Sequence, residues 1–248
     1  MSKSNRNGEF DLTGKVAMVT GAGRGMGAHI AYTLSCYGAD LIICSRTQTE
    51  LDTVAKKIEA DGHKVMSYPI DLTRVEALPS MVEECEAQMG AIDILVNNAG
   101  INIPQAAEDV TVDAWDQIMA INLKAQFFCA QAVGRQMIKR KQGKIIMMSS
   151  QAGSIGLLKR AAYCSSKGAI NQLTRTLAIE WAKHNITVNA IAPAFIEDAG
   201  IFCQWSDEQK ESLLEKVFVD RIGNVDDVVR AFRYLFAVSY THLRAHET

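Results

Sequence analysis

The chain has 248 residues, a formal net charge of −2 and hydrophobic side chains at 48% of its positions. This length fits one α/β domain, and the balanced charge provides no basic field for a nucleic-acid backbone. No apolar run approaches the roughly 20 residues that span a bilayer, and residues 1–9 lack the apolar stretch of a secretory signal. We therefore expect a cytoplasmic globular protein that binds neither nucleic acid nor a membrane.

Short apolar runs alternate with longer amphipathic segments along the whole chain. The runs predict six strands, at residues 15–20, 41–44, 65–68, 92–96, 145–149 and 187–192. Helices are predicted at residues 24–37, 50–61, 75–89, 112–121, 125–141 and 160–183, with two more between residues 207 and 236. Strands this short and apolar are typical of a doubly wound parallel sheet with helices on both faces. The sequence therefore predicts a single α/β domain.

A glycine-rich loop follows the first predicted strand and leads into the first predicted helix. Its sequence is Thr20-Gly21-Ala22-Gly23-Arg24-Gly25-Met26-Gly27. By itself the pattern is also that of a tight strand-to-helix turn. In this position, however, glycines let the backbone approach a pyrophosphate, and the helix N-terminus points unpaired N–H groups at it. The loop thus predicts dinucleotide binding.

The second strand ends in Ser45-Arg46, where NAD-selective sites of this architecture carry an acid that bonds the adenosine ribose. Without that acid, a 2′-phosphate can bind Arg46, together with Arg24 from the glycine loop, through charge-assisted hydrogen bonds. The alternative is that both arginines are solvated surface charges. The sequence favours NADP(H) over NAD(H) as the cofactor.

A serine, a tyrosine and a lysine stand in order near the end of the fifth strand and on the next helix. Ser150 precedes Tyr163 by thirteen residues, and Lys167 follows Tyr163 by four, so the last two share one helical face. Alone, such a pair also fits a lysine stem that covers an aromatic ring. The order glycine loop, serine, tyrosine and lysine makes the pattern specific.

At this point the chain resembles the short-chain dehydrogenase/reductase family, over about residues 10–236. The resemblance rests on Thr20 to Gly27, Asp71-Leu72, Asn97-Asn98-Ala99-Gly100, Asn122, Ser150, Tyr163 and Lys167. It is closest to the NADP(H)-preferring branch of 3-oxoacyl reductases and of keto-sugar-acid and polyol dehydrogenases. It implies a Rossmann-type sheet flanked by helices, in a domain at residues 10–237 after a flexible segment at residues 1–9.

The resemblance also implies a cofactor-binding role for many residues. They are Gly21, Gly23, Arg24, Gly25, Met26, Gly27, Ser45, Arg46, Asp71, Leu72, Asn98, Ala99, Gly100, Tyr163, Lys167, Pro193 and Ile196. Asp71 and Leu72 would flank the adenine, and Asn98 and Ala99 would lie along the adenosine side. The alternatives are a strand-end cap for Asp71 and turn or helix-kink roles for the asparagines.

The expected catalytic residues are Asn122, Ser150, Tyr163 and Lys167. A free tyrosine has a pKa of about 10, and a nearby ammonium is expected to lower it. In reduction, Tyr163 would give its proton to the carbonyl oxygen, and Ser150 would hydrogen-bond that oxygen. By resemblance, Lys167 would also bond the nicotinamide ribose, and Asn122 would fix a water that relays protons.

Two segments depart from the family pattern. After Pro193 the family has a glycine and, four residues later, a threonine near the nicotinamide carboxamide, but Ala194 and Asp198 stand there. Residues 199–218 fit either a cap over the substrate or a simple helix pair. Residues 238–248 lack the expected seventh strand and are predicted to be a non-native tail. Its His-x-x-x-His spacing has no third ligand, so no metal is predicted.

The sequence as a whole predicts an oxidoreductase that transfers hydride between NADP(H) and a carbonyl or secondary alcohol. The substrate stays open among 3-oxoacyl thioesters, keto-sugar acids or polyols, and steroid-like or xenobiotic ketones. The family pairs through helices that correspond to residues 125–141 and 160–183, so a homodimer or homotetramer is expected. The alternatives are a non-catalytic NADP(H)-binding regulator and a truncated fragment with impaired folding.

Overall fold

The computed structural model describes residues 11–197, 206, 208, 211 and 221–237. They form one parallel sheet with the strand order β3-β2-β1-β4-β5-β6. The strands are β1 (Val16–Thr20), β2 (Asp40–Ser45), β3 (Val65–Pro69), β4 (Ile92–Asn97), β5 (Gly143–Met148) and β6 (Ile186–Ile191). All six predicted strands are therefore confirmed, in a doubly wound order.

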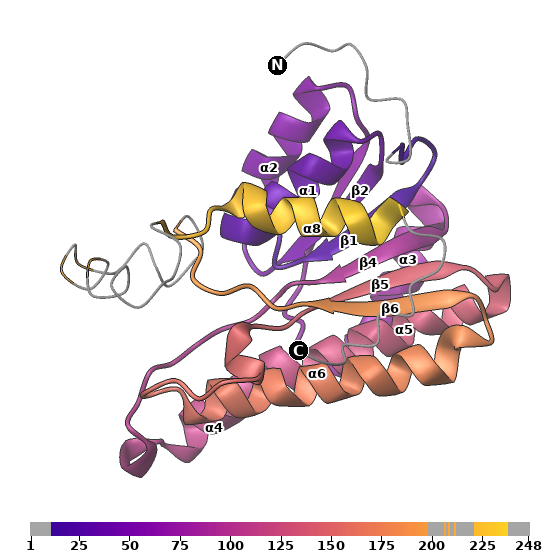
Figure 1. The fold of residues 1–248 in the computed structure, drawn as a ribbon. Helices are drawn as coiled ribbons and strands as arrows, with labels where there is room; N and C mark the ends of the chain where they lie inside the picture. The colour runs from indigo at the N-terminus through magenta and orange to yellow at the C-terminus, as the bar shows by residue number, and fades with distance from the viewer. Residues whose placement is uncertain (1–10, 198–205, 207, 209–210, 212–220, 238–248) are drawn as a thin grey trace.

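Helices cover both faces of this sheet (Figure 1). One face carries α1 (Gly25–Cys36), α2 (Gln48–Ala60) and α8 (Val225–Ala237). The other carries α3 (Leu78–Met89), α5 (Gln126–Arg140) and α6 (Ala161–Ala182), and α4 (Val112–Met119) lies against α6. The predicted Rossmann-type architecture is thus confirmed.

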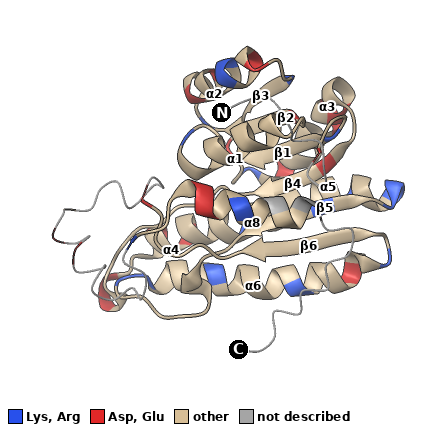
Figure 2. Cartoon of the chain, turned by 45° about the horizontal axis from the view of Figure 1, so that its top comes forward, with Lys and Arg blue, Asp and Glu red and all other residues tan. Residues whose placement is uncertain are grey.

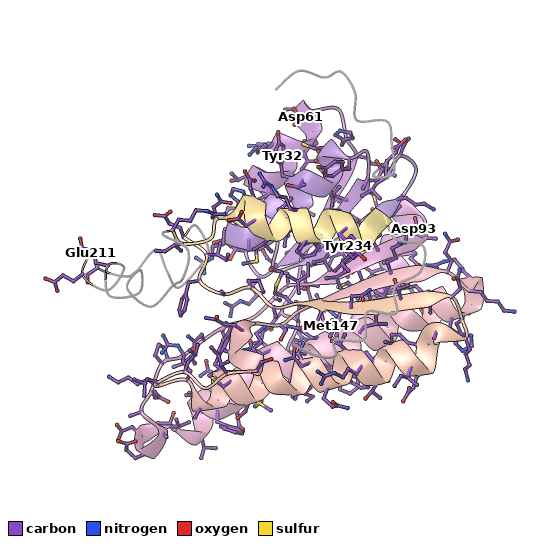
Figure 3. All side chains as sticks on the ribbon, viewed as in Figure 1. Tyr32, Asp61, Asp93, Met147, Glu211 and Tyr234 are labelled. Carbon is purple, nitrogen blue, oxygen red and sulfur yellow. The ribbon has the colours of Figure 1, made fainter. Side chains whose placement is uncertain are left out.

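The two cores follow from the alternation of side chains along each strand. In β1, Ala17 and Val19 pack toward α1, α2 and α8, whereas Val16 and Met18 pack toward the opposite layer. Met147 of β5 belongs to that second core and is labelled in Figure 3. Figure 2 shows the charged residues on helices and at strand ends, while the strands are mostly uncharged. This pattern explains why the strand sequences are continuously apolar.

The segment between α4 and α5 differs from the sequence prediction. Two helices with a break near residues 122–124 were expected, but a π-helical turn at Ala120–Ala125 joins α4 to α5 without a gap. A π turn leaves one backbone group out of the regular ladder, and such turns are frequent at functional sites. Asn122 lies in this turn and is fully buried.

The predicted C-terminal elements are covered only in part. Of the two helices expected between residues 207 and 236, the structure describes α8, and the residues of the other lie mostly outside the described part. The described residues contain six strands, with β6 at one edge of the sheet. Residues 1–9 and 238–248 also lie outside the described part. None of the described helices is long and apolar enough to cross a membrane.

The strand order predicts a ligand crevice at the carboxyl ends of the strands, which form one end of the sheet. The chain moves from β3 at one side to β4 beside β1, so the connections after β1 and β4 leave toward opposite faces. In open α/β sheets a ligand binds outside the carboxyl ends of the strands at such a switch point. Thr20, Asn97 and Met148 end the three central strands β1, β4 and β5 at this end of the sheet.

Candidate active site

The glycine loop is held against the ends of β2 and β4. The N–H of Ala22 donates to the carbonyl oxygen of Cys44 at 3.1 Å. Asn98 Nδ2 donates to the carbonyl oxygens of Thr20 at 3.0 Å and Gly21 at 3.3 Å. A Cβ placed on Gly27 would lie 2.2 Å from the Gly21 oxygen and 2.6 Å from Asn98 Nδ2. Only glycine fits at this position without moving the helix or the loop.

The loop and the helix after it have the features that a dinucleotide needs. Gly21 and Gly25 have φ values of +65° and +56°, which side chains other than glycine rarely adopt. No side chain caps the N-terminus of α1, and its first turn carries no acidic residue. Its backbone N–H groups and positive dipole end are therefore available to an anion. The described residues fit the pyrophosphate of a dinucleotide at this loop.

The adenosine side of the loop contains charges of both signs. A Cβ on Gly23 would lie 2.8 Å from Ser45 Oγ and 2.9 Å from Glu50 Oε2, so both side chains reach the loop. Glu50 Oε1 is also 3.6 Å from Arg24 Nη1. Ser45 lies at the end of β2, as predicted, and Arg46 is exposed beside it. Although residue 45 is a serine and not an acid, Glu50 therefore supplies a carboxylate to this region.

Asp71 and Leu72 follow β3 at the same end of the sheet. Asp71 Oδ1 accepts hydrogen bonds from Thr73, at 3.0 Å from the N–H and 2.8 Å from Oγ1. These bonds are the main cause that lowers the pKa of Asp71. Leu72 is buried in the core on the α3 side. These bonds fit the alternative of a strand-end cap, and the contact of Asp71 with adenine stays a prediction.

At the other end of the crevice, Asn122 connects the segment after β4 to α6. Its Oδ1 accepts from the N–H of Ile101 at 2.8 Å, and its Nδ2 donates to the Ile101 oxygen at 2.9 Å and to Ser166 Oγ at 3.1 Å. These bonds satisfy the buried amide and fix the segment after β4 against α6. Gly100 lies between Asn122 and Lys167, because a Cβ on it would be 3.1 Å from Asn122 Oδ1 and 3.6 Å from Lys167 Nζ.

Ser150, Tyr163 and Lys167 meet beside this point. Lys167 is 3% exposed, and its Nζ donates to the Met148 carbonyl oxygen at 2.7 Å and lies 5.7 Å from the centre of the Tyr163 ring. The Ser150 side chain hydrogen-bonds Tyr163, and Ser150 Oγ accepts from the N–H of Ala152 at 3.2 Å. Thus the structure brings together all four predicted catalytic residues, from the segment after β5, from α6 and from the π turn.

The electrostatics of this cluster differ from the expectation. Burial raises the pKa of Tyr163 more than the hydrogen bond from Ser150 lowers it. Burial also lowers the pKa of Lys167 to about 8, because the ammonium loses hydration. The expected net lowering of the Tyr163 pKa is wrong for this arrangement, since burial has the largest effect and raises that pKa.

The remaining predicted residues lie at the same end of the sheet. Ala99 is buried, and its N–H donates to Thr20 Oγ1 at 3.1 Å. The Pro193 oxygen accepts from the N–H of Gln151 at 3.0 Å and is 3.5 Å from Ser150 Oγ. Ile196 is buried and forms an isolated bridge with Gly223. Asp198 and residues 199–205 lie outside the described residues, so the substrate cap stays a prediction.

Two charged residues near the site were not identified from the sequence. Arg160 precedes α6, and its charge lowers the pKa of Tyr163, after the larger effects of burial, Ser150 and Cys164. Its position three residues before Tyr163 was the signal, because residues i and i+3 are neighbours on a helix. For Glu50 the signal was its distance from the glycine motif, because an acid about 20 residues further along can bond the ribose.

Comparisons with known proteins agree with this geometry. The family model of the short chain dehydrogenases matches residues 15–210. An NAD-dependent glycerol dehydrogenase of Listeria innocua is 36% identical over 92% of this chain and 88% of its own length. A gluconate 5-dehydrogenase of Gluconobacter oxydans is 35% identical, over 91% and 89%. A 2-dehydro-3-deoxy-D-gluconate 5-dehydrogenase of Bacillus subtilis is 37% identical, over 96% and 93%.

Solved structures are similar over the same range. One comes from Beutenbergia cavernae, is assigned as an NAD(P)-dependent gluconate 5-dehydrogenase, and holds NADP at low occupancy. It superposes with a TM-score of 0.89 at 33% identity, over 95% of each chain. A short-chain type dehydrogenase/reductase of Mycobacterium marinum has a TM-score of 0.85 at 32% identity, over 94% of this chain and 92% of its own. The chain therefore belongs to the short-chain dehydrogenase family and is an NAD(P)-dependent oxidoreductase that acts on CH–OH or carbonyl groups.

Proposed function

We propose that this enzyme interconverts a keto group and a secondary alcohol on a sugar acid or polyol, with NADP(H) preferred over NAD(H). The observation that carries the chemistry is the convergence of Ser150 and Tyr163 beside the buried Lys167. The substrate class is supported by the relatives, which are described as gluconate, deoxygluconate and glycerol dehydrogenases. The cofactor preference is supported by Arg24 and Arg46 at the adenosine end and by the absence of an acid at Ser45.

Each residue has a separate proposed part in the reaction. A bound nicotinamide supplies the hydride in reduction and accepts it in oxidation. Tyr163 donates its proton to the substrate oxygen during reduction. Burial raises the pKa of its hydroxyl and so favours the protonated form. The Ser150 hydroxyl bonds the same oxygen and orients it. Lys167 would hold the nicotinamide ribose and, with a pKa of about 8, can exchange protons near neutral pH.

Asn122 has a positioning role in this proposal. Its Nδ2 donates to Ile101 and Ser166 and its Oδ1 accepts from Ile101, which supports a role in holding these segments together. The π turn around it changes the backbone ladder between α4 and α5. We propose that the turn, rather than the amide, places the water that relays protons from Lys167.

An assembly through α5 and α6 is part of the proposal. Ile179 on α6 is 79% exposed, which is unusual for a large apolar side chain. Pairing of these helices between two subunits would cover it and would make the homodimer or homotetramer expected for the family. The domain boundaries at residues 10–237 and the non-native character of residues 238–248 also stay proposals.

The function is tested with a substrate panel and the variant Tyr163→Phe. Keto-sugar acids and ketoses are expected to be reduced in preference to 3-oxoacyl thioesters and steroid ketones. Because Tyr163 supplies the proton, the variant should lose turnover by about 10³-fold. Its dissociation constant for NADPH, measured by fluorescence titration, should stay within about threefold, since the hydroxyl contributes little to cofactor affinity. Retained turnover would contradict the role of Tyr163.

A further inference from the structure

We propose that Glu50, in the first turn of α2, determines how strongly this enzyme distinguishes NADP(H) from NAD(H). The inference rests on the proposed dinucleotide site and adds a residue that the glycine motif does not contain. In it, Glu50 supplies the carboxylate that is missing at the end of β2. It accepts the adenosine ribose hydroxyl of NAD(H) and opposes the 2′-phosphate of NADP(H).

The position of Glu50 follows from the short connection between β2 and α2. β2 ends at Ser45 and α2 begins at Gln48, so the first turn of α2 lies directly beyond the strand end. The N–H of Ala22 bonds the Cys44 oxygen, which brings the glycine loop beside that same end. Oε2 of Glu50 and Oγ of Ser45 would then both be within 2.9 Å of a Cβ on Gly23. The loop, the hydroxyl and the carboxylate therefore meet at one place.

This place is where the ribose of a bound dinucleotide is expected. In the βαβ fold, the pyrophosphate sits at the N-terminus of the first helix, and an acid about 20 residues further along the chain bonds the ribose 2′-hydroxyl. Glu50 lies 23 residues after Gly27 (50 − 27 = 23). An ionised carboxylate only accepts hydrogen bonds, so it pairs with a hydroxyl but not with a phosphate oxygen. Glu50 thus has the spacing and chemistry of the missing acid.

Arg24 and Glu50 favour different cofactors. Their side chains form an ion pair at 3.6 Å, in which Arg24 is 84% exposed and Glu50 is 34% exposed. Exposed pairs of this kind contribute little to stability, so a ligand can displace one partner. A 2′-phosphate would take Arg24 from Glu50 and would place its own negative charge beside the carboxylate. The arginine favours NADP(H), and Glu50 reduces that advantage.

The other charges nearby do not replace Glu50. Asp71 also lies at this end of the sheet, but its Oδ1 is occupied by the N–H and hydroxyl of Thr73. Arg46 is exposed. Its charge lowers the pKa of Asp71, but the Thr73 hydrogen bonds and burial have larger effects on that pKa. Among the described residues, Glu50 is the carboxylate in contact with the glycine loop. We therefore expect NAD(H) to be used as well as NADP(H).

The test compares Glu50→Gln with Glu59→Gln, which makes the same charge change elsewhere on α2. Glu59 is exposed and nine residues along, on the opposite side of the helix. Dissociation constants for NADPH and NADH are measured by titration of nicotinamide fluorescence, and kcat/KM is measured for both. Glu50→Gln should tighten NADPH by about tenfold, or about 1.4 kcal/mol, because the repulsion is removed. NADH should change by less than about threefold, since the glutamine oxygen still accepts a hydrogen bond.

Each result decides the proposal. The proposal is supported if the ratio of the Kd for NADH to the Kd for NADPH shifts in Glu50→Gln and stays unchanged in Glu59→Gln. An unchanged ratio in Glu50→Gln, or an equal shift in both variants, overturns it. Thermal melting of the variants checks that both are folded. If the unaltered protein binds neither nucleotide, the proposed dinucleotide site itself fails; if it binds both and only the ratio is insensitive, the role of Glu50 alone fails.

Discussion

The two ends of the crevice hold their polar groups in different ways. At the catalytic end, Asn122 is fully buried and Lys167 is 3% exposed, and each bonds backbone atoms that lie far away in the sequence. At the adenosine end, the Arg24 side chain is 84% exposed and forms an ion pair with the Glu50 side chain. Buried polar groups must be satisfied inside the protein, whereas exposed ones can exchange partners with water or a ligand. The catalytic end is thus fixed by folding, and the adenosine end can respond to its cofactor.

The largest expected effect is at Lys167 and depends on pH. Burial lowers the pKa of Lys167 to about 8, so below that pH the folded protein holds a buried charge, which costs stability. This cost is relieved as the pH rises from 8 toward 10.5, because the folded protein has lost the proton and the unfolded chain still holds it. The free energy of unfolding should therefore rise by about 3 kcal/mol between pH 7 and pH 10.5, relative to Lys167→Met. Urea denaturation of both proteins measures this difference.

The comparison with a second lysine variant separates burial from charge. Lys183 lies just beyond α6 and is exposed, so Lys183→Met should show no pH-dependent difference from the unaltered protein. If the difference in unfolding free energy between the unaltered protein and Lys167→Met were also independent of pH, the ammonium would be hydrated. The contrast between the two ends of the crevice would then disappear.

An intermediate effect is expected at Gly27, in the glycine-rich segment where the loop continues into α1. The methyl group of Gly27→Ala would collide with the Gly21 oxygen and Asn98 Nδ2, so the helix or the loop must shift. Such overpacking costs about 1–3 kcal/mol of unfolding free energy. Displacement of the loop should also weaken NADPH binding. Gly156→Ala is the control, because nothing lies within 4 Å of a Cβ there. Equal melting temperatures of the two variants would refute the close approach.

The smallest effect on stability is expected at Arg24. Because the ion pair with Glu50 is exposed, Arg24→Ala should change the free energy of unfolding by less than about 0.5 kcal/mol. Its effect should appear in cofactor binding, where NADPH loses about tenfold in affinity and NADH changes little. Arg175→Ala, an exposed arginine on α6, should alter neither quantity. A large loss of stability in Arg24→Ala would show that the adenosine end is as rigid as the catalytic end.

Much of the fold was predictable because it depends on local patterns. The six apolar runs gave the six strands, since strands buried on both faces need continuous apolar sequence. The glycine loop was predictable from its place after a strand, and Tyr163 and Lys167 from their spacing on a helix. The π turn at Ala120–Ala125 was not predicted, and the bonds of its buried Asn122 to Ile101 join segments that no local pattern relates.

The sequence by itself determined the catalytic residue types, their order and the loop that fits a pyrophosphate. Only the tertiary structure decided their electrostatic environment. Ser45 predicted a region without a carboxylate, yet the turn into α2 brings Glu50 to the same loop. The sequence predicted that Lys167 lowers the pKa of Tyr163, yet burial raises that pKa. Charge pairing and desolvation depend on which distant segments meet and exclude water, and spacing along the chain does not contain that information.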